Sequence, residues 1–380
     1  MLDLSDEHQM ILDTVRDLVN DKIKPRAKSY DLSGDFPHDN IEELAELGIV
    51  GMTVKEEYGG FGSDQLTYAT VVEEISRGCA STATTIAGTN TLAVVPIQDW
   101  GSDYLKNKFL PMLIEGVNLG AFALSEPQAG SDVANLKTRA VKEGNEYVIN
   151  GSKIYITNAI VAKLFIVFAR TSPDQGYKSI SAFVVPADTP GVHVMPKEKK
   201  LGITASATSA MTFENVRIPE ENLIGEEGLG FKIAMNTLNS GRISVAALAV
   251  GIAQAAFDDA VKFAKEREQF NQSIAKFQSI QMMIAEMSTR IMSARLMYYH
   301  AARLKDSNRP YIKEAAMAKL YASETATYVA HKAIQIHGGS GFLKDFEVER
   351  YYRDARITEI YEGTSEILRI VISREELKEG

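Results

Sequence analysis

The periodicity of the apolar residues changes twice along this 380-residue chain, and these two changes constrain the fold more than any other feature. Residues 1–119 show helical spacing, for example at Ile11 and Val15. Residues 120–225 alternate with period two and are divided into short runs by glycine and proline, which is typical of an antiparallel β domain. Residues 226–380 return to helical spacing. The pattern predicts an α+β fold, mostly α, with an N-terminal helical domain, a middle β domain and a C-terminal helical domain.

The C-terminal domain is predicted to be a four-helix bundle. Helical spacing is sustained over about 229–269, 278–306, 310–337 and 365–376. These stretches are rich in Ala, Met and Leu, which suit packing in a bundle. The methionines of the second stretch are therefore expected in the core. They are Met282, Met283, Met287 and Met292.

Composition and charge narrow the classes of function. The chain is 45% hydrophobic and 24% charged, as in a soluble globular protein. A net charge of −9 argues against nucleic acid or an anionic membrane as partner, and no apolar stretch reaches membrane-spanning length. The single cysteine, Cys79, excludes an intrachain disulfide and suits a reducing compartment. The acidic N-terminus resembles neither a signal nor a transit peptide, so a cytoplasmic location is expected. The histidines lie apart in the sequence, and no metal site is predicted.

A carboxylate on a short break between two helical patterns is the main candidate for chemistry. Glu362 is followed by Gly363, which lets a ligand or another backbone approach closely. Thr364 or Ser365 can cap the helix that follows. A lone glutamate is most often a solvated surface charge. The flanking run RDARITEIYEGTSEI, at 353–367, favours a functional reading instead.

That run closely resembles the C-terminal signature of the acyl-CoA dehydrogenases, FAD enzymes that introduce an α,β double bond into acyl-CoA thioesters. The resemblance extends over essentially the whole chain. It implies that Glu362 takes the α-proton while the β-hydride passes to flavin N5. It also implies that Thr364 contacts FAD and that Tyr361 and Gly363 contact the substrate. The thioester carbonyl would be bound by a flavin ribityl hydroxyl and by the backbone amide of Glu362, an arrangement that stabilises the enolate.

Two runs of the middle domain are similar to flavin-binding segments of the family. In AFALSEPQAGSD, at 121–132, the resemblance places Leu124 and Ser125 against the isoalloxazine and Ser131 near the CoA phosphates. In YITN, Tyr155 and Thr157 are two residues apart, so they are expected on one face of a strand. The family uses that face to cover the flavin.

Further family positions lie in the C-terminal domain. Arg242 would reach toward the substrate. Arg267 and Phe270 resemble the R-x-x-F-G motif, whose arginine pairs with the FAD pyrophosphate. In this chain Asn271 replaces the glycine, and asparagine tolerates a left-handed backbone.

The run QIHGGSG, at 335–341, resembles the adenine and pyrophosphate loop of the family and contains Gln335 and Gly339. Together with Arg267 and Phe270, these residues would reach the FAD of a neighbouring subunit. The resemblance therefore implies a homotetramer, built as a dimer of dimers.

The substrate is left open between short, branched and cyclic acyl-CoA. The segment at 88–98 would face the acyl tail, and it contains small and medium residues without charge. Electron-transfer flavoprotein is the acceptor that the resemblance implies. An acyl-CoA oxidase or a glutaryl-CoA-type dehydrogenase is the alternative, although no arginine between Arg77 and Arg139 is available to bind a second carboxylate. A non-catalytic scaffold is disfavoured, because Glu362 and the flavin motifs are present.

Overall fold

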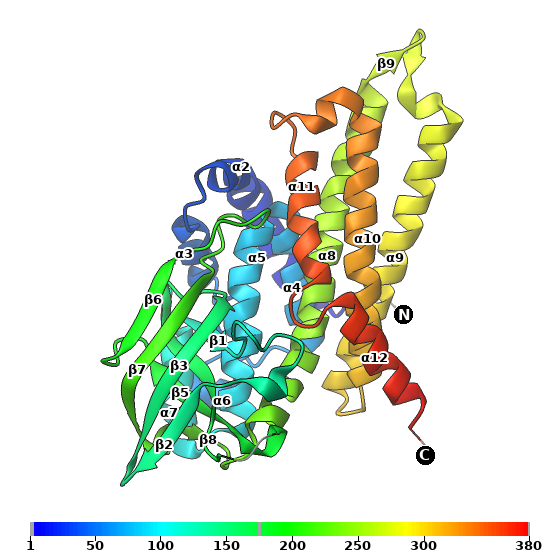
Figure 1. Cartoon of the computed structure of the whole chain (residues 1–380). Helices are drawn as coiled ribbons and strands as arrows, with labels where there is room; N and C mark the ends of the chain where they lie inside the picture. The colour runs from blue at the N-terminus through cyan, green and yellow to red at the C-terminus, as the bar shows by residue number, and fades with distance from the viewer. Residues whose placement is uncertain (1–3, 174–175, 379–380) are drawn as a thin grey trace.

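The computed structural model describes residues 4–173 and 176–378. Figure 1 shows a sheet on one side of the molecule, the long helices of the C-terminal part on the other, and helices of the N-terminal part beside both. One apolar core joins the two helical parts, since Val72 and Ile75 belong to the same cluster as Ala246 and Leu248. The predicted α+β, mostly helical fold is confirmed.

The N-terminal part consists of short helices. Two of them, α4 and α5, follow one another with a break of one residue. The break falls at Cys79, whose backbone is extended with φ of −152°. Gly78 precedes it and is a poor helix former. The helices are α1 (Asp6–Leu18), α2 (Lys24–Ser33), α3 (His38–Glu46), α4 (Gln65–Gly78), α5 (Ala80–Ala87), α6 (Val94–Trp100) and α7 (Asp103–Ile114), with π-helical turns at Val19–Ile23 and Gly88–Ala93.

The middle part folds into one mixed sheet with the order β6-β7-β3-β2-β4-β5-β8 and with β1 beside β4. Most neighbours are antiparallel, as predicted, but β1 and β2 run parallel to β4. Parallel pairing needs a long connection, and the chain between β1 and β4 supplies one. The strands are β1 (Leu119–Ala123), β2 (Arg139–Glu143), β3 (Glu146–Ile156), β4 (Ala162–Arg170), β5 (Ile180–Pro186), β6 (Val192–Lys197), β7 (Ser209–Pro219) and β8 (Leu223–Ile224).

Strand β4 is buried on both of its faces. Leu164 and Ile166 pack in the cluster that includes α6 and α7. Phe165 and Val167 pack in a second cluster on the opposite face. The period-two alternation thus orients the strand between two apolar layers.

The C-terminal helices agree closely with the predicted stretches. Their bounds are α8 (Gly230–Glu266), α9 (Gln278–Asp306), α10 (Ile312–His337), α11 (Val348–Ala355) and α12 (Ser365–Glu376), and a small hairpin of β9 (Glu268–Gln269) and β10 (Gln272–Ser273) joins α8 to α9. Helix α11 forms the helical pattern expected before Glu362, although it lies outside the four stretches whose bounds were predicted. It buries Arg350 and Asp354, which are 4% and 2% exposed, so apolar spacing alone does not give its bounds.

The methionines of α9 are only partly in the core, contrary to expectation. Met287 is fully buried, but Met282 is 62% exposed and Met292 47%. They lie on the side of α9 that faces away from the other helices of this chain, so their burial would require another surface.

By length and composition alone, helix α8 is long and apolar enough to span a membrane. The expectation that no apolar stretch reaches membrane-spanning length is therefore wrong. Within the fold, 78% of an apolar 18-residue window of α8 is buried inside the chain. Burial on all sides is what makes a helix apolar around its circumference.

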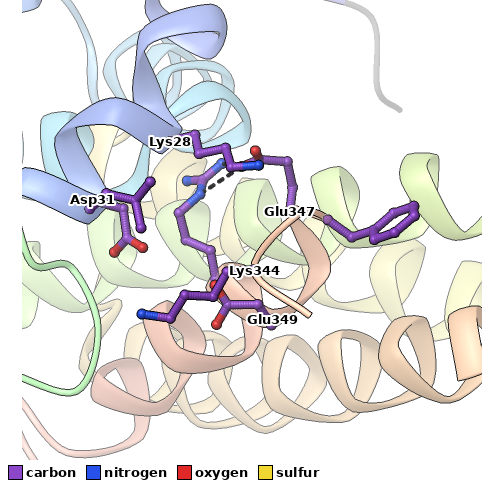
Figure 2. A pocket seen from close by; sticks show the side chains of 8 residues that line it. Lys28, Asp31, Lys344, Glu347 and Glu349 are labelled. Atoms are coloured by element: carbon purple, nitrogen blue, oxygen red, sulfur yellow. Dashed lines mark hydrogen bonds and ion pairs between the residues drawn. The ribbon is translucent and has the colours of Figure 1, made fainter. Parts of the chain in front are cut away.

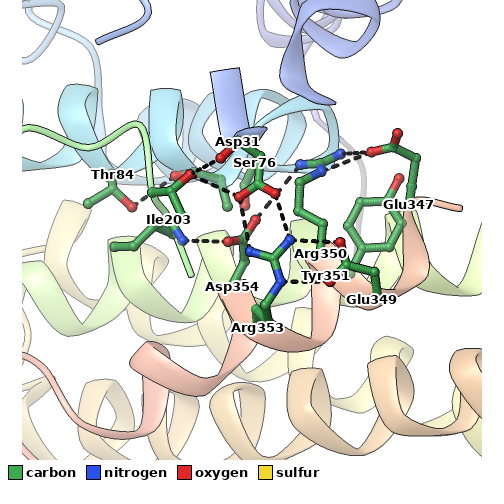
Figure 3. A network of polar contacts seen from close by, with 12 residues as sticks. Asp31, Ser76, Thr84, Ile203, Glu347, Glu349, Arg350, Tyr351, Arg353 and Asp354 are labelled. Atoms are coloured by element: carbon green, nitrogen blue, oxygen red, sulfur yellow. Dashed lines mark hydrogen bonds and ion pairs between the residues drawn. The ribbon is translucent and has the colours of Figure 1, made fainter. Parts of the chain in front are cut away.

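A polar network ties α11 to the other two parts of the chain (Figure 3). Arg353 Nη2 lies 2.6 Å from Asp31 Oδ2 of α2, and Arg353 also pairs with Glu349. The Asp354 carboxylate accepts a hydrogen bond from the backbone N–H of Ile203, in the loop between β6 and β7. Because Asp354 lies eight residues before Glu362 in the sequence, the network fixes the segment that leads to the candidate base.

Candidate active site

Glu362 lies on a loop between a 3₁₀ turn at Arg356–Glu359 and helix α12. Its backbone is left-handed, with φ of 53°, and Gly363 follows with φ of 106°. A left-handed glutamate is disfavoured, and such residues concentrate at functional sites. The Thr364 hydroxyl accepts a hydrogen bond from the Ile367 amide at 3.3 Å and caps α12, so of the two expected capping residues Thr364 is the one used.

The Glu362 side chain points at Gly241, in the first half of α8. A Cβ atom built on Gly241 would lie 2.0 Å from Glu362 Oε2, so a glycine is needed there to leave room for the carboxylate. Oε2 is buried and has no hydrogen-bond partner among the described residues. A buried carboxylate oxygen in this state is costly for the folded protein, and it can accept a proton from a ligand.

Burial also sets the proton affinity of this carboxylate. It raises the pKa of Glu362 to about 7, while Lys319 and Arg242 act in the opposite direction. A general base is most effective when its pKa lies near the working pH. The Glu362 carboxylate therefore has the unpaired acceptor oxygen and the basicity that proton abstraction requires.

Arg242 of α8 lies beside this loop, as the prediction of a substrate-side arginine requires. Its side chain is almost fully buried, and Nη1 donates to Asn239 Oδ1 at 2.7 Å. Nε has no partner in the described part of the chain. A Cβ built on Gly363 would lie 3.9 Å from Arg242 Nη2, which places the guanidinium in contact range of the loop.

Lys319 of α10 is a residue of this site that was not predicted from the sequence. It is 0% exposed, and its Nζ donates to the Gly363 carbonyl oxygen at 2.6 Å. Burial lowers the pKa of this ammonium to about 8. The signal was present in the sequence, because Lys319 lies on the same helical stripe as the buried Ala315, Ala322 and Ala326.

Three hydroxyl groups from different segments contact one another in turn. The Tyr68 hydroxyl lies 3.1 Å from Thr91 Oγ1, which in turn lies 3.1 Å from Ser244 Oγ. Burial raises the pKa of Tyr68, and the Glu362 charge adds to that rise, so the two groups are close enough to interact. Thr91 belongs to the segment expected to face the acyl tail. These contacts join that segment to α4 and α8.

The loop after β1, which contains the predicted flavin contacts Leu124 and Ser125, is held firmly to β3. Lys153 Nζ of β3 donates to the Leu124 carbonyl at 3.1 Å and to Glu126 Oε1 at 2.7 Å. The Ser125 carbonyl accepts from the Ile154 amide at 2.9 Å. Lys153 is fully buried, so this part of the loop is rigid.

Tyr155 and Thr157 do not share one face of a strand, so that expectation is wrong. Strand β3 ends at Ile156, and the register shifts between Lys153 and Ile156. Tyr155 has a left-handed backbone, with φ of 59°, and is 70% exposed. Thr157 lies beyond the strand, where its Cγ2 would be 3.6 Å from a Cβ built on Gly88. Ser131 lies on an exposed turn of the same part of the chain.

The remaining predicted cofactor residues lie at the other end of the bundle. Figure 1 shows the β9 hairpin and α12 at opposite ends of the long helices. Arg267 is 26 residues from Gly241 along α8 in sequence, which corresponds to about 40 Å of helix rise. Phe270 at the hairpin tip is 87% exposed, and Gln335 and Gly339 are exposed as well. Asn271 has φ of 61°, which confirms the expected left-handed backbone. The fold of one chain therefore does not bring these residues to Glu362.

Other hollows of the structure are unrelated to this site. The one in Figure 2, between Lys28 and Lys344, holds about 10 Å³, room for roughly one water. A larger hollow of about 290 Å³ is lined by Arg295 and Gln254. Gln254 is about 20 Å along α8 from Gly241. Among the described residues no three His, Cys, Asp or Glu side chains gather in a way that could hold a metal ion.

Comparison with known proteins identifies the family. Models of the N-terminal, middle and C-terminal domains of acyl-CoA dehydrogenase match residues 5–117, 121–216 and 228–377. The chain is an acyl-CoA dehydrogenase. The mitochondrial short-chain specific acyl-CoA dehydrogenase of Rattus norvegicus is 49% identical over 98% of this chain and 90% of its own length.

Solved structures of acyl-CoA dehydrogenase fold are similar over the whole chain. Butyryl-CoA dehydrogenase from Megasphaera elsdenii matches with a TM-score of 0.97 at 43% identity, and the match covers 100% of both chains. A chain from a study of the electron transferring flavoprotein of Acidaminococcus fermentans matches with a TM-score of 0.98 at 44% identity and the same coverage. The FAD complex of PigA shares the fold at 29% identity, with a TM-score of 0.95 over 99% of both chains.

FAD is the cofactor of this acyl-CoA dehydrogenase, and the residues present fit it. Ser365 Oγ, at the first turn of α12, is buried without a partner among the described residues. It adjoins Thr364 at a helix N-terminus, where backbone amides and hydroxyls favour polar and anionic groups. In the loop at Leu124 and Ser125, bonds to β3 fix the backbone that would line a flavin edge.

Proposed function

We propose that this acyl-CoA dehydrogenase oxidises a short acyl-CoA between its α and β carbons, with Glu362 as the general base. The observation that carries the proposal is the buried Glu362 Oε2 atom, which has no partner in the described chain and belongs to a carboxyl whose pKa burial raises to about 7. Such a group is ionised in part at neutral pH and takes up a proton readily.

Each group of the site then has a defined task. The Glu362 carboxylate takes the α-proton, and the backbone N–H of Glu362 donates to the thioester carbonyl, where negative charge develops. Bound FAD supplies the acceptor for the β-hydride. Arg242 and Lys319 keep the Glu362 pKa from rising further. Leu124, Ser125, Tyr155, Thr157 and Thr364 contact the flavin in this proposal, and Ser131, Tyr361 and Gly363 contact the acyl-CoA.

A short acyl group is favoured by the hydroxyl groups beyond Glu362. The linked hydroxyls of Tyr68, Thr91 and Ser244 present polar atoms where a long aliphatic tail would need apolar surface. The names of the short-chain and butyryl-CoA relatives support the same substrate class. Branched and cyclic acyl groups of similar size are the alternatives.

Measurement of kcat/KM for a set of acyl-CoA substrates decides between these alternatives. Butyryl-, isobutyryl-, cyclohexanecarboxyl- and palmitoyl-CoA are compared at equal concentration with an artificial electron acceptor. The highest kcat/KM is expected for butyryl-CoA. A higher value for palmitoyl-CoA would refute the size argument. Oxygen consumption at the rate of turnover would identify an acyl-CoA oxidase instead.

We also propose a homotetramer, a dimer of dimers in which each FAD contacts two subunits. The separation of about 40 Å along α8 between Arg267 and the Glu362 region supports it, because one FAD does not extend so far. The exposed side chains of Phe270, Met282 and Met292 supply apolar surface for such contacts. Electron-transfer flavoprotein is the proposed acceptor, supported by the related chain from a study of that flavoprotein. A cytoplasmic location stays a prediction.

The role of Glu362 is tested by anaerobic mixing with butyryl-CoA while the flavin absorbance is followed. Glu362→Gln keeps the size of the side chain and removes its basicity, so flavin bleaching should slow by roughly 10²–10⁴-fold or more. FAD content should stay at the wild-type level. Glu366→Gln is the matched control, because Glu366 is exposed one helical turn further on. Bleaching of Glu362→Gln at the wild-type rate would show that another group takes the proton.

A further inference from the structure

Lys319 is a charged side chain that contacts the Glu362–Gly363 loop and that belongs to none of the family motifs described above. Its ammonium is fully buried within α10, on a helical stripe that otherwise contains alanines. Burying a lysine is unfavourable unless its charge and its N–H donors are satisfied. The Gly363 carbonyl oxygen, 2.6 Å from Nζ, accepts a hydrogen bond from one of its three N–H donors.

The bond from Lys319 acts at the point where the loop needs support. Glu362 and Gly363 both have positive φ, at 53° and 106°, and the first of these is an unfavourable conformation for a glutamate. Such a backbone persists only where its surroundings hold it. The Lys319 ammonium holds the Gly363 carbonyl, and this fixes the orientation of the residue directly after the base.

The same ammonium belongs to the charges that face the Glu362 carboxylate. Lys319 of α10 and Arg242 of α8 oppose the rise of the Glu362 pKa that burial causes. Tyr361 in the loop and Tyr68 of α4 also interact with Glu362, and their phenols stay neutral because burial raises their pKa.

Lys319 is itself subject to opposing charges. The carboxylates of Glu362, Glu359 and Glu366 favour its charged form, whereas Arg242 and burial disfavour it. Lys319 donates directly to the loop, whereas Arg242 is turned toward Asn239.

We propose that Lys319 is a positioning residue for the reaction, which holds the Glu362–Gly363 backbone through the Gly363 carbonyl and keeps the base ionised at neutral pH. The proposal rests on the proposed role of Glu362. It predicts two separable effects of Lys319, one on the geometry of the loop and one on the pH at which the base becomes active.

The test is the pH profile of kcat/KM for butyryl-CoA in the FAD-loaded enzyme. In the wild type the rising limb should lie near pH 7. Lys319→Met removes both the donor and the charge, so the limb should move upward by on the order of one pH unit, the effect of losing a nearby opposite charge. The rate on the plateau should also fall at least tenfold, since the loop loses its support. Lys319→Arg keeps the charge and should leave the limb in place.

Controls separate this role from a general loss of structure. Lys313→Met changes a lysine on the partly exposed side of the same helix, where it pairs with Glu376, and should leave the profile unchanged. FAD absorbance and the thermal midpoint report folding of each variant. If Lys319→Met does not fold, Lys319→Gln, which keeps a donor without the charge, takes its place and should show the shifted limb with a smaller loss on the plateau.

The outcomes that overturn the proposal are distinct from those that overturn the role of Glu362. A folded, FAD-loaded Lys319→Met or Lys319→Gln with the wild-type limb would reject the role of Lys319, provided that flavin bleaching is slowed in Glu362→Gln. Bleaching of Glu362→Gln at the wild-type rate would reject the base assignment itself and with it the proposal.

Discussion

Replacement of Glu362 by glutamine should make the protein more stable relative to the wild type as the pH rises. Burial raises the pKa of Glu362 from 4.5 to about 7, so the folded protein binds this proton more tightly than the unfolded chain does. The stabilisation from this proton is fully present below pH 4.5 and is lost as the pH rises through 7. A pKa difference of about 2.5 corresponds to about 3 kcal/mol per subunit. Glutamine has no proton to lose and escapes this penalty.

The assay compares urea unfolding of the wild type and Glu362→Gln at pH 5 and pH 8 with saturating FAD. Between pH 5 and pH 8, the unfolding free energy of Glu362→Gln should rise relative to that of the wild type by most of the about 3 kcal/mol per subunit. Glu366→Gln is the control, because its neighbourhood lowers the pKa of Glu366, whose contribution is lost only at lower pH. An equal difference between wild type and Glu362→Gln at both pH values would refute a buried carboxyl with a raised pKa.

Further predictions concern the cofactor, the base and the helix cap. Arg267→Ala should lower both FAD occupancy and the fraction of tetramer, measured by absorbance and light scattering, and a monomer with full FAD would contradict the shared site. Gly241→Glu should partly restore flavin bleaching to Glu362→Gly but not to Glu362→Gln, because a Cβ at Gly241 meets the retained side chain at 2.0 Å. Thr364→Ala removes the N-cap of α12 and should lower the free energy of unfolding by about 1 kcal/mol in thermal unfolding, and an unchanged thermal midpoint would contradict the capping role.

The long helices and the sheet were predictable because their patterns are repeated many times. The stretches expected at 278–306 and 365–376 coincide with α9 and α12. Apolar periodicity reports burial against neighbours in the same chain, so it succeeds where the chain packs on itself. It also explains the error at Met282 and Met292, whose apolar side chains are 62% and 47% exposed within one chain.

The features that sequence could not reveal depend on contacts between distant segments. Tyr155 and Thr157 fit an alternating pattern, but an irregularity in the pairing of β3 with β7 reverses that alternation locally. The bond from Lys319 to Gly363 spans 44 residues, and no local pattern encodes it. Glu362 itself was found by its motif, whereas its left-handed backbone and its contact with Gly241 required the structure.

The contact between the β6–β7 loop and α11 has a consequence for the evolution and engineering of the chain. Gly202 packs directly on the Arg353 backbone, since a Cβ there would lie 2.3 Å from the Arg353 carbonyl oxygen. Ile203 keeps a left-handed backbone, with φ of 42°, beside Asp354. A chimera that exchanges the middle segment for that of a distant homologue would therefore have to carry both sides of this contact. The β6–β7 loop and α11 should therefore be exchanged together.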